Sequence, residues 1–284
     1  MCSSKNNKEN PSPDSSPIAH YNGVFSARRK NGEIYFRASL THKNKHISLG
    51  SFREPQKAHQ AYLEGGRLLS DKTVSLIDYN RSSPLSFEKW VCLINYRDNS
   101  IYLSSPIYIG QRIIYYYLSP SHILKFDMDD LFYYSSHKIM CRGRHYFVSD
   151  YGMQVNIAAR YGIKNYAVRG RDYDFINGDE TDFRRENISV TNIYHGLRKS
   201  DVKGGTIYSV YIHVRGNLLV GRYDSEIKAA IAYNKAIDIL KKNGVNKNYT
   251  PNYIDGLSPS KYAEIYSALT ISRGIINFRI KDKI

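Results

Sequence analysis

Hydrophobic and polar residues alternate along two stretches of the chain, one near each end. A period of two residues is typical of a β-strand with one buried and one exposed face. The first stretch alternates Phe36, Ala38 and Leu40 with Tyr35, Arg37, Ser39 and Thr41; the second alternates Tyr208, Val210, Ile212 and Val214 with Ser209, Tyr211 and His213. Turn residues flank both, at Lys30-Asn31-Gly32, Lys43-Asn44-Lys45, Lys203-Gly204-Gly205 and Arg215-Gly216-Asn217. Each region is therefore predicted to form a three-stranded antiparallel meander.

A helix is predicted to follow each meander. The first begins after Arg53-Glu54, with Pro55 in its first turn, where proline is compatible with helix geometry. In the second region Asp224 or Ser225 is the expected N-cap, and Glu226 lies at the positive end of the helix dipole. Apolar residues then recur at helical spacing, at Ala229, Ala232, Tyr233, Ala236, Ile237 and Leu240. We expect each helix to cover one sheet face and to leave the other free to meet a partner.

The two regions are copies of one pattern, and this internal repeat is the strongest organising feature of the sequence. The stretch from Tyr21 to Leu69 recurs from Tyr194 onward. The matched positions are Gly23-Val24 with Gly196-Leu197, Ile34-Tyr35-Phe36 with Thr206-Ile207-Tyr208, Leu49-Gly50-Ser51-Phe52 with Val220-Gly221-Arg222-Tyr223, and Ala58, Ala61 and Tyr62 with Ala229, Ala232 and Tyr233.

The positive charge of the chain is concentrated in these copies. The protein has 284 residues and a formal net charge of +15, with a pI near 9.5. Residues 20–80 contain 10 Lys and Arg against 5 Asp and Glu, a net of +5, and residues 193–253 contain 10 against 4, a net of +6. The intervening residues 81–192 contain 14 against 12, a net of only +2. This distribution is typical of a surface that binds phosphates.

The repeated pattern resembles the APETALA-2/ethylene-response-factor DNA-binding domain in its phage and bacterial form. The resemblance rests on Gly-Val, an aromatic residue two positions before Ala or Val on the second strand, Leu-Gly-x-Phe, and Ala-x-x-Ala-Tyr on the helix, over about fifty residues in each copy. It implies that the exposed sheet face lies in the major groove of duplex DNA. The family's arginine after Gly-Val is Phe25 in the first copy and Arg198 in the second, and its strand tryptophan is Phe36 and Tyr208. The resemblance therefore implies the docking mode but not the base specificity.

Strand residues and basic turns are the implied nucleic-acid contacts. In the first copy they are Phe25, Ala27, Arg28, Arg29, Lys30, Arg37, Ser39, Lys43 and Lys45. In the second copy they are Arg198, Lys199, Lys203, Ser209, Tyr211, His213, Arg215 and Asn217.

The segment between the copies resembles the end of an HNH homing-endonuclease domain. Its sequence YDFINGDETDFRRENISVT, from Tyr173 to Thr191, matches the family pattern D-H-I-N-G-D followed by D-N-R-R-x-N-L. The resemblance implies a metal-dependent nuclease scaffold over residues 100–192. A nuclease of this type needs a histidine base and ligands for one divalent ion. The corresponding positions are Phe175, Phe183 and Asn156, and a phenyl ring neither takes a proton nor binds a metal.

We therefore interpret the middle segment as a degenerate HNH-like (ββα-like) domain without catalytic residues, metal or cofactor. Arg184 and Arg185 remain as candidate phosphate contacts. The predicted organisation is an α+β chain with a disordered tail at 1–19, the first domain at 20–80, the HNH-like domain at 81–192, the second domain at 193–253, and a C-terminal helix and basic tail at 254–284. In the middle domain, helices are expected near 126–132 and 155–161 and a strand at 146–148. In the C-terminal segment, a helix is expected at 258–269.

Cysteine usage and hydropathy bound the compartment. Cys2, Cys92 and Cys141 have neither disulfide nor metal spacing, which favours a reducing intracellular compartment, with the nucleoid, the nucleus or an organelle as the expected location. Apolar runs are of strand length rather than the roughly 18 residues of a membrane span, so no membrane partner is expected.

The sequence thus favours a sequence-preferring protein that binds double-stranded DNA through two sheet faces, such as a transcription regulator or a domesticated relative of a homing endonuclease. Three alternatives stay open: an active HNH endonuclease, a protein that binds structured RNA or the ribosome, and an architectural partner-binding protein. DNA and RNA binding use the same lysines and arginines, so the sequence does not separate them. It also leaves the oligomeric state and the target sequence open.

Overall fold

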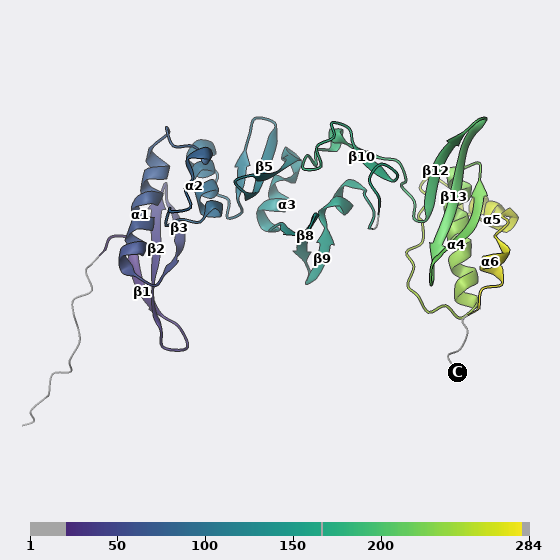
Figure 1. Ribbon diagram of the computed structural model, residues 1–284, viewed down its shortest axis with the longest axis horizontal. Helices are drawn as coiled ribbons and strands as arrows, with labels where there is room; N and C mark the ends of the chain where they lie inside the picture. Colours follow the sequence, from purple (N-terminus) through teal and green to yellow (C-terminus); the bar gives the residue numbers. More distant parts are fainter. Residues whose placement is uncertain (1–20, 166, 280–284) are drawn as a thin grey trace, which may run out of the picture. The chain divides into compact units, whose positions relative to one another are not determined.

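The computed structural model describes residues 21–165 and 167–279 (Figure 1). The described chain is α+β, with several small three-stranded antiparallel sheets, so this part of the predicted fold class is confirmed. Contacts divide it into two compact units: the chain up to Ile109 with Ser119–His122, and Gly110–Leu118 with the chain from Ile123 onward. The predicted tail at 1–19 lies outside the described residues, as do residues 280–284 of the predicted basic tail.

The first copy forms the predicted meander and helix. Strands β1 (Val24–Arg28), β2 (Ile34–His42) and β3 (Lys45–Phe52) pair in the order β1-β2-β3, and α1 (Pro55–Ser70) follows with proline at its start. Lys43 and Asn44 form the turn between β2 and β3 with φ values of 45° and 62°. Positive φ at both central residues is the type I′ geometry that matches the twist of a hairpin.

The second copy repeats this architecture. Strands β12 (Leu197–Val202), β13 (Gly205–His213) and β14 (Asn217–Tyr223) pair in the order β12-β13-β14, and α4 (Glu226–Lys242) follows. The N-cap of α4 is Ser225, one of the two predicted residues. The meander and the helix predicted for this region are therefore confirmed.

Strand register is the same in the two copies. Val24 pairs with Ala38, and Ala38 with Gly50; in the second copy the equivalent residues are Leu197, Val210 and Gly221. A β-bulge follows at the same place, between Ala38 and Ser39 and between Val210 and Tyr211. Because a shift of one residue would move every side chain to the opposite face, the shared register and bulge fix equivalent faces in both sheets.

A glycine and a tyrosine close each sheet against its helix. Gly23 has φ of +73°, and a Cβ placed there would lie 2.0 Å from the ring of Tyr62 on α1. Gly196 has φ of +78°, and its Cβ would lie 2.4 Å from the ring of Tyr233 on α4. The carbonyl of each glycine accepts a hydrogen bond from the bulge, from Ser39 N at 2.9 Å and Tyr211 N at 2.8 Å. Only a residue without a side chain allows this approach.

The first sheet and helix share their core with the next helix, α2 (Phe87–Asn99). Trp90, Leu93 and Ile94 of α2 are buried with Leu68 and Leu69 of α1, and η1 (Leu76–Asp78) lies between the two helices in the sequence. The sequence predicts that the middle domain begins at residue 81; α2 follows this position, and its buried residues extend the apolar core of the first copy.

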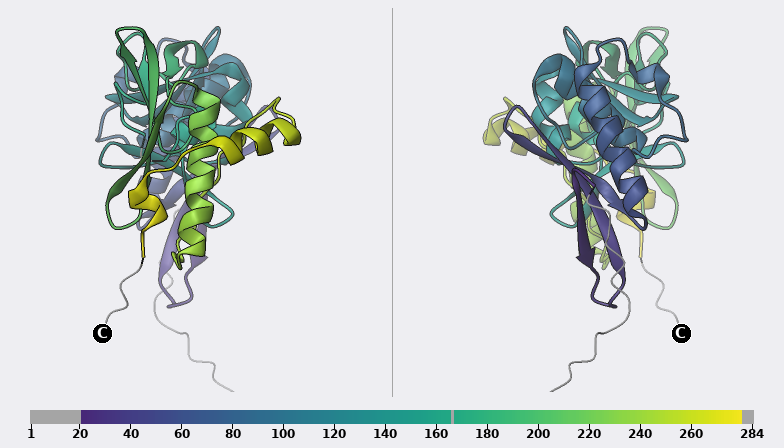
Figure 2. Two further views of the ribbon diagram at one scale, coloured as in Figure 1. Left: turned by 90° about the vertical axis from the view of Figure 1, so that its right-hand side faces the viewer. Right: turned by 90° about the vertical axis from the view of Figure 1, so that its left-hand side faces the viewer.

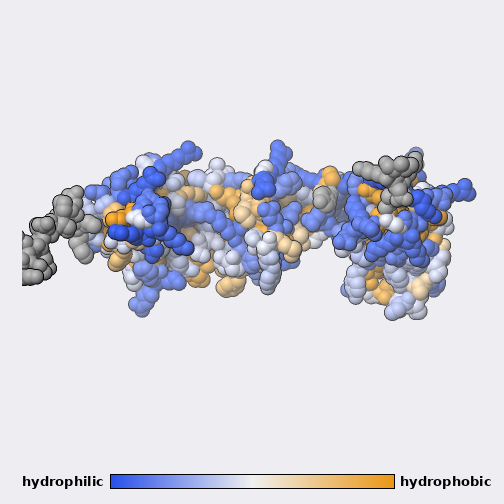
Figure 3. Space-filling model, turned by 90° about the horizontal axis from the view of Figure 1, so that it is seen from below, coloured by the Kyte–Doolittle hydropathy of each residue, from blue (hydrophilic) through white to orange (hydrophobic). Residues whose placement is uncertain are grey.

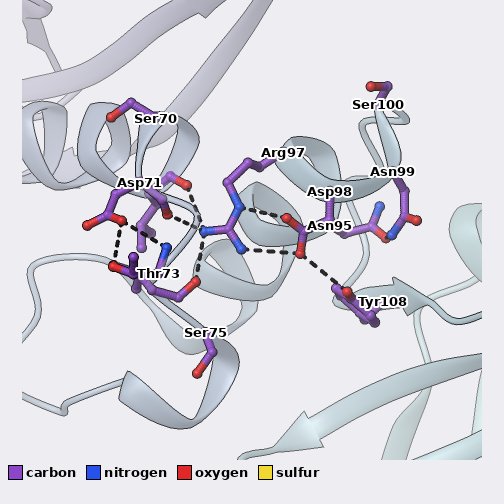
Figure 4. A network of polar contacts seen from close by, with 12 residues as sticks. Ser70, Asp71, Thr73, Ser75, Asn95, Arg97, Asp98, Asn99, Ser100 and Tyr108 are labelled. Carbon is purple, nitrogen blue, oxygen red and sulfur yellow. Dashed lines mark hydrogen bonds and ion pairs between the residues drawn. The ribbon is translucent and has the colours of Figure 1, made fainter.

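Arg97 ties α2 to the end of α1 (Figure 4). Its Nη1 donates to the carbonyls of Leu68, Asp71 and Val74, the last two at 2.6 and 2.8 Å, and its Nε donates to Asp98 at 2.7 Å. The Arg97 side chain is only 6% exposed. Carbonyls at the end of a helix lack intrahelical partners, so this buried guanidinium satisfies them.

The second helix is covered by elements from the C-terminal part of the chain (Figure 2, left). These are α5 (Pro259–Ala268), which confirms the predicted C-terminal helix, and α6 (Arg273–Ile276). Ala230 and Ile231 pack against Tyr262 and Ile265, on a different side of α4 from the residues that pack on the sheet. Lys235 Nζ donates to the carbonyls of Tyr266 and Leu269 at 2.7 and 2.8 Å and thereby caps α5.

The segment between the copies contains short strands and helical turns. The strands are β4 (Ile107–Ile109), β5 (Ile113–Ser119) and β6 (His122–Asp127) in one sheet, β7 (Met140–Arg142), β8 (His145–Asp150) and β9 (Met153–Asn156) in a second, and the pair β10 (Tyr173–Phe175) and β11 (Ile188–Val190). The helical elements are η2 (Met128–Asp130), α3 (Leu131–Ser136), η3 (Ile157–Tyr161) and η4 (Arg185–Asn187). The strand at 146–148 is confirmed, whereas the helix expected at 126–132 begins later, because Phe126 and Asp127 end β6.

We predict that Gly23→Ala destabilises the first unit more than Gly32→Ala does. Both glycines have positive φ, but nothing lies within 4 Å of a Cβ at Gly32. Both variants should lose about 1–2 kcal/mol from backbone strain, and Gly23→Ala a further ~1–3 kcal/mol from the clash with Tyr62. Urea unfolding followed by the fluorescence of Trp90, the single tryptophan, measures the first unit alone. Equal unfolding midpoints for the two variants would show that the close contact between Gly23 and Tyr62 does not limit the side chain at this position.

Candidate nucleic-acid interface

The uncovered face of the first sheet is defined by side chains that point away from α1. Phe25, Arg37 and Ser51 are directly opposite one another on β1, β2 and β3 and form one row across it. All three are exposed, and Phe25 is 59% exposed, a high value for a phenylalanine. Side chains opposite each other on neighbouring strands point to the same face, so this row can meet a partner as a unit.

The second sheet presents the equivalent row Arg198–Ser209–Arg222 on β12, β13 and β14. Arg222 is exposed, and Arg198 and Ser209 are half-buried. Further along the same face lie Tyr211 and His213, which are opposite Leu219 and Asn217. The face is thus polar and basic, whereas Val210 and Ile212 on the other face are buried under α4.

Tyrosine rings orient the arginines on both faces. Arg37 donates from Nε and Nη2 to the hydroxyl of Tyr35 at 3.2 and 2.7 Å. Arg29 also approaches this ring, 5.6 Å from its centre, and pairs with Glu33 at 3.1 Å. On the second face the Arg198 guanidinium lies 4.3 Å from the centre of the Tyr211 ring. Such contacts restrict a long side chain before any partner binds and reduce the entropy lost on binding.

The structure places the residues predicted from the sequence in three groups. Phe25, Ala27 and Arg37 lie on the uncovered face of the first sheet, and Arg198, Ser209, Tyr211, His213 and Asn217 on that of the second. Exposed turns hold Arg29, Lys30, Lys43, Lys203 and Arg215. The other strand positions, Arg28, Lys45 and Lys199, lie on the helix side of their sheets, where Lys45 is 5.6 Å from the centre of the Tyr102 ring and Lys199 is opposite Tyr208.

Ser39 is a predicted contact that the structure shows to be buried. It lies at the bulge, is only 7% exposed, and its backbone NH is bonded to Gly23. The extra residue of the bulge is Leu49 on β3, so Ser39 keeps the face that the alternating pattern predicts, opposite Ser48, but its side chain is covered by its neighbours. Its counterpart Tyr211 is half-buried and lies beneath Arg198.

Tyr35, Ser51 and Arg222 lie on the uncovered faces and are among the residues absent from the sequence-based set. Tyr35 holds Arg37, while Ser51 and Arg222 complete the two rows. The signal for the last two is their position directly after Gly50 and Gly221 in the repeat. Since the glycines face the helix side, the next residue points to the uncovered face.

The positions that the HNH resemblance assigns to catalysis come together in the second unit. Asn156, Phe175 and Phe183 line one cavity of about 270 Å³, with His145 and Tyr146. Phe183 is 4% exposed, and its ring centre lies 5.6 to 5.9 Å from those of Phe175, Phe126, Tyr161 and Tyr146. The two phenylalanines therefore belong to an aromatic core. The Asn156 side chain accepts a hydrogen bond from Ala158 N and begins η3.

Acidic residues of the same motif have partners within the protein. Asp179 pairs with Lys125 at 2.8 Å and accepts hydrogen bonds from Thr181. Asp182 is buried and accepts hydrogen bonds from Arg184 and Asn177. These contacts fix the turn between β10 and β11 and attach it to β6.

The pKa values of these carboxyl groups follow from their partners. Hydrogen bonds from Lys125 and Thr181 lower the pKa of Asp179 to about 2. Burial acts to raise the pKa of Asp182, but hydrogen bonds and the charge of Arg184 outweigh it, and the pKa is lowered. Both groups are therefore ionised at neutral pH and neutralised by cations of the protein itself.

The two arginines predicted to contact phosphate have different roles. Arg184 pairs with Asp182 and Glu186, so its guanidinium is engaged inside the domain. Arg185 is exposed, and its backbone NH is held by Asp127 at 2.8 Å. Arg185 is thus the more exposed of the two. The side of the molecule drawn in Figure 3 is predominantly hydrophilic.

No protein family, curated protein or solved structure matches the chain. Within residues 21–165 and 167–279, His, Cys, Asp and Glu side chains do not gather in groups of three or more that could hold a metal ion. The helices of this same part of the chain lack the combination of length and apolar character that a membrane span requires. The interface described above therefore rests on the geometry of the two sheets.

We predict that Asp179 stabilises the second unit in a pH-dependent way. Its pKa is lowered from 3.8 to about 2, so the stabilisation is complete above about pH 4 and is lost as the pH falls toward 2. Asp179→Asn should therefore be less stable than the wild type at pH 6, with a difference that narrows between pH 4 and pH 2. Tyrosine circular dichroism during urea unfolding measures this change.

Trp90 fluorescence in the same samples is the internal control, since that residue lies in the first unit. A stability difference that stays constant from pH 6 to pH 2 would show that the ion pair with Lys125 does not contribute.

Proposed function

We propose that the protein binds double-stranded DNA through the uncovered faces of its two sheets. The observation that carries this proposal is the repeated register. Two separate meanders hold arginine-containing rows, Phe25–Arg37–Ser51 and Arg198–Ser209–Arg222, at equivalent positions opposite the helix. In both copies the helix packs on the opposite face of the sheet. In the second copy Arg198, Tyr211, His213 and Asn217 also line a pocket with Lys164 and Arg171 of the preceding segment, which adds further cations beside the row.

The dimensions and charge of the faces support duplex DNA as the partner. Neighbouring strands are ~4.8 Å apart, so a three-stranded face is about 10 Å across, which fits a major groove about 12 Å wide. Each copy carries a net positive charge, +5 for residues 20–80 and +6 for residues 193–253. Exposed turn lysines, such as Lys30 and Lys203, lie at the sheet ends, where they can reach phosphates while the rows meet base edges.

The aromatic core at Phe175 and Phe183 supports a scaffold role for the middle segment rather than DNA cleavage. Water activation needs a base and a metal-binding set at the scissile phosphate. Two of the three positions that the resemblance assigns to these roles are buried phenyl rings, and Asn156 caps a helical turn. His145 is exposed and lines the same cavity, so a cleavage assay belongs with the binding measurements.

Two binding faces on one chain raise the affinity for a matching DNA. One small module makes few contacts and binds weakly. Binding of the first places the second at a high effective concentration near the same duplex, which increases affinity by roughly two to four orders of magnitude when the spacing fits. We therefore propose a site with two separated parts.

We predict that Arg198→Ala weakens duplex binding while Lys199→Ala changes it little. The two residues are neighbours in sequence and carry the same charge, but Arg198 lies on the uncovered face and Lys199 on the helix side. Loss of a base-reading arginine should cost ~1–3 kcal/mol of binding free energy. Fluorescence anisotropy with a selected duplex at several salt concentrations, with and without Mg²⁺, measures binding, and a gel of the same samples detects cutting.

Equal effects of Arg198→Ala and Lys199→Ala would contradict binding through the sheet face. Tighter binding to a structured RNA of matched length than to any duplex would assign the basic faces to RNA instead. A Mg²⁺-dependent product would establish the endonuclease alternative.

A further inference from the structure

We infer that the two sheet faces recognise different base sequences, so that the full target is a non-palindromic site with two unlike half-sites. This inference rests on the proposed binding of duplex DNA. It concerns the specificity of the two faces, which the repeat by itself would predict to be the same.

The shared register makes a position-by-position comparison of the faces legitimate. Phe25 and Arg198 occupy the same place on the first strand of each sheet, one residue after the pair that defines the register. Arg37 and Ser209 occupy the centre of the row, and Ser51 and Arg222 its far end. At all three positions the two copies carry different chemistry, although the buried residues around them are of the same kind.

The row of the second copy has arginines at both ends and a small residue in the centre. Arginine binds guanine through two hydrogen bonds to O6 and N7 in the major groove. Arg198 and Arg222 are two strands apart, so their backbones are separated by about 10 Å. They can therefore contact two guanines at separated positions, while Ser209 leaves space for the base pairs between them.

The row of the first copy has the opposite arrangement. Its single arginine, Arg37, is in the centre, between the exposed ring of Phe25 and the hydroxyl of Ser51. One guanine contact is then flanked by an apolar surface, and the methyl group of thymine is the apolar feature of the major groove. This face should prefer one G·C pair with a neighbouring thymine.

The tyrosines that contact the arginines also differ between the two copies. Tyr35 holds Arg37 by hydrogen bonds from the same strand, and the equivalent position in the second copy is Ile207, which cannot accept one. Tyr211 instead lies under Arg198, and its equivalent in the first copy is the buried Ser39. Arg37 and Arg198 are therefore oriented by tyrosines at different positions of the two sheets.

Selection of the full chain on a randomised duplex pool tests the inference. We expect two enriched half-sites of different sequence, one with two separated G·C pairs and one with a single G·C pair next to thymine. Arg222→Ala should reduce discrimination at one G·C pair of the first of these roughly tenfold and leave the other half-site unchanged. Arg37→Ala should act only on the half-site with a single G·C pair.

A transfer experiment gives the stricter test. The triple variant Phe25→Arg, Arg37→Ser, Ser51→Arg places the row of the second copy on the first sheet, at exposed positions that leave the core intact. Both half-sites selected by this triple variant should then contain two separated G·C pairs. Lys199→Ala is the control for a change of charge off the face, and it should leave both half-sites as in the wild type.

The outcomes separate the inference from the proposed function. Duplex binding with two identical half-sites, or loss of the same base preference in Arg222→Ala and Arg37→Ala, overturns the inference and leaves DNA binding in place. Absence of duplex binding by the wild type overturns both. If Trp90 fluorescence shows that the triple variant is unfolded, the single variants Arg222→Ala and Arg37→Ala still test whether the two half-sites differ.

Discussion

Both copies depend on one steric constraint, the passage of the chain over a tyrosine ring at a residue that has no side chain. Gly23 and Gly196 make this approach to Tyr62 and Tyr233, and each glycine carbonyl also accepts a hydrogen bond from the central strand, at the residue where the register with the third strand shifts. The contact sets the distance between sheet and helix, and the bulge sets which residues point outward beyond it. The close approach of sheet and helix in each copy therefore depends on a single glycine.

Local features of these copies could be predicted from the sequence because local chemistry determines them. Turn residues such as Lys30-Asn31-Gly32 end strands wherever they occur, and the alternation on β2 and β13 reports burial directly. Ser39 keeps its place in this alternation, since the extra residue of the bulge is Leu49 on β3, yet its side chain is only 7% exposed. A pattern of period two indicates the face on which a side chain lies but not how far its neighbours cover it, so the set of exposed residues was less predictable than the strands themselves.

Non-local packing was beyond the sequence pattern. The apolar residues of α2 are spread around the helix, including Trp90, Val91, Cys92, Leu93 and Ile94, so they indicate burial but not the partner. Arg97 is read from the sequence as a surface charge, yet it is buried on the carbonyls at the end of α1. The second helix recruits α5 by the reverse arrangement, with Lys235 donating from α4. Each copy is completed by a different following segment, which a repeat alignment does not show.

The aromatic core of the middle segment limits which substitutions are possible at two of its positions. Phe175 and Phe183 fill the centre of a cluster that also includes Phe126 and Tyr161. A histidine or asparagine introduced at either position would place an imidazole or amide among rings without partners for its polar atoms, and would remove packing contacts of several neighbours. Either substitution therefore costs folding stability unless neighbouring rings change with it. The aromatic cluster thus restricts the side chains that these two positions can accept.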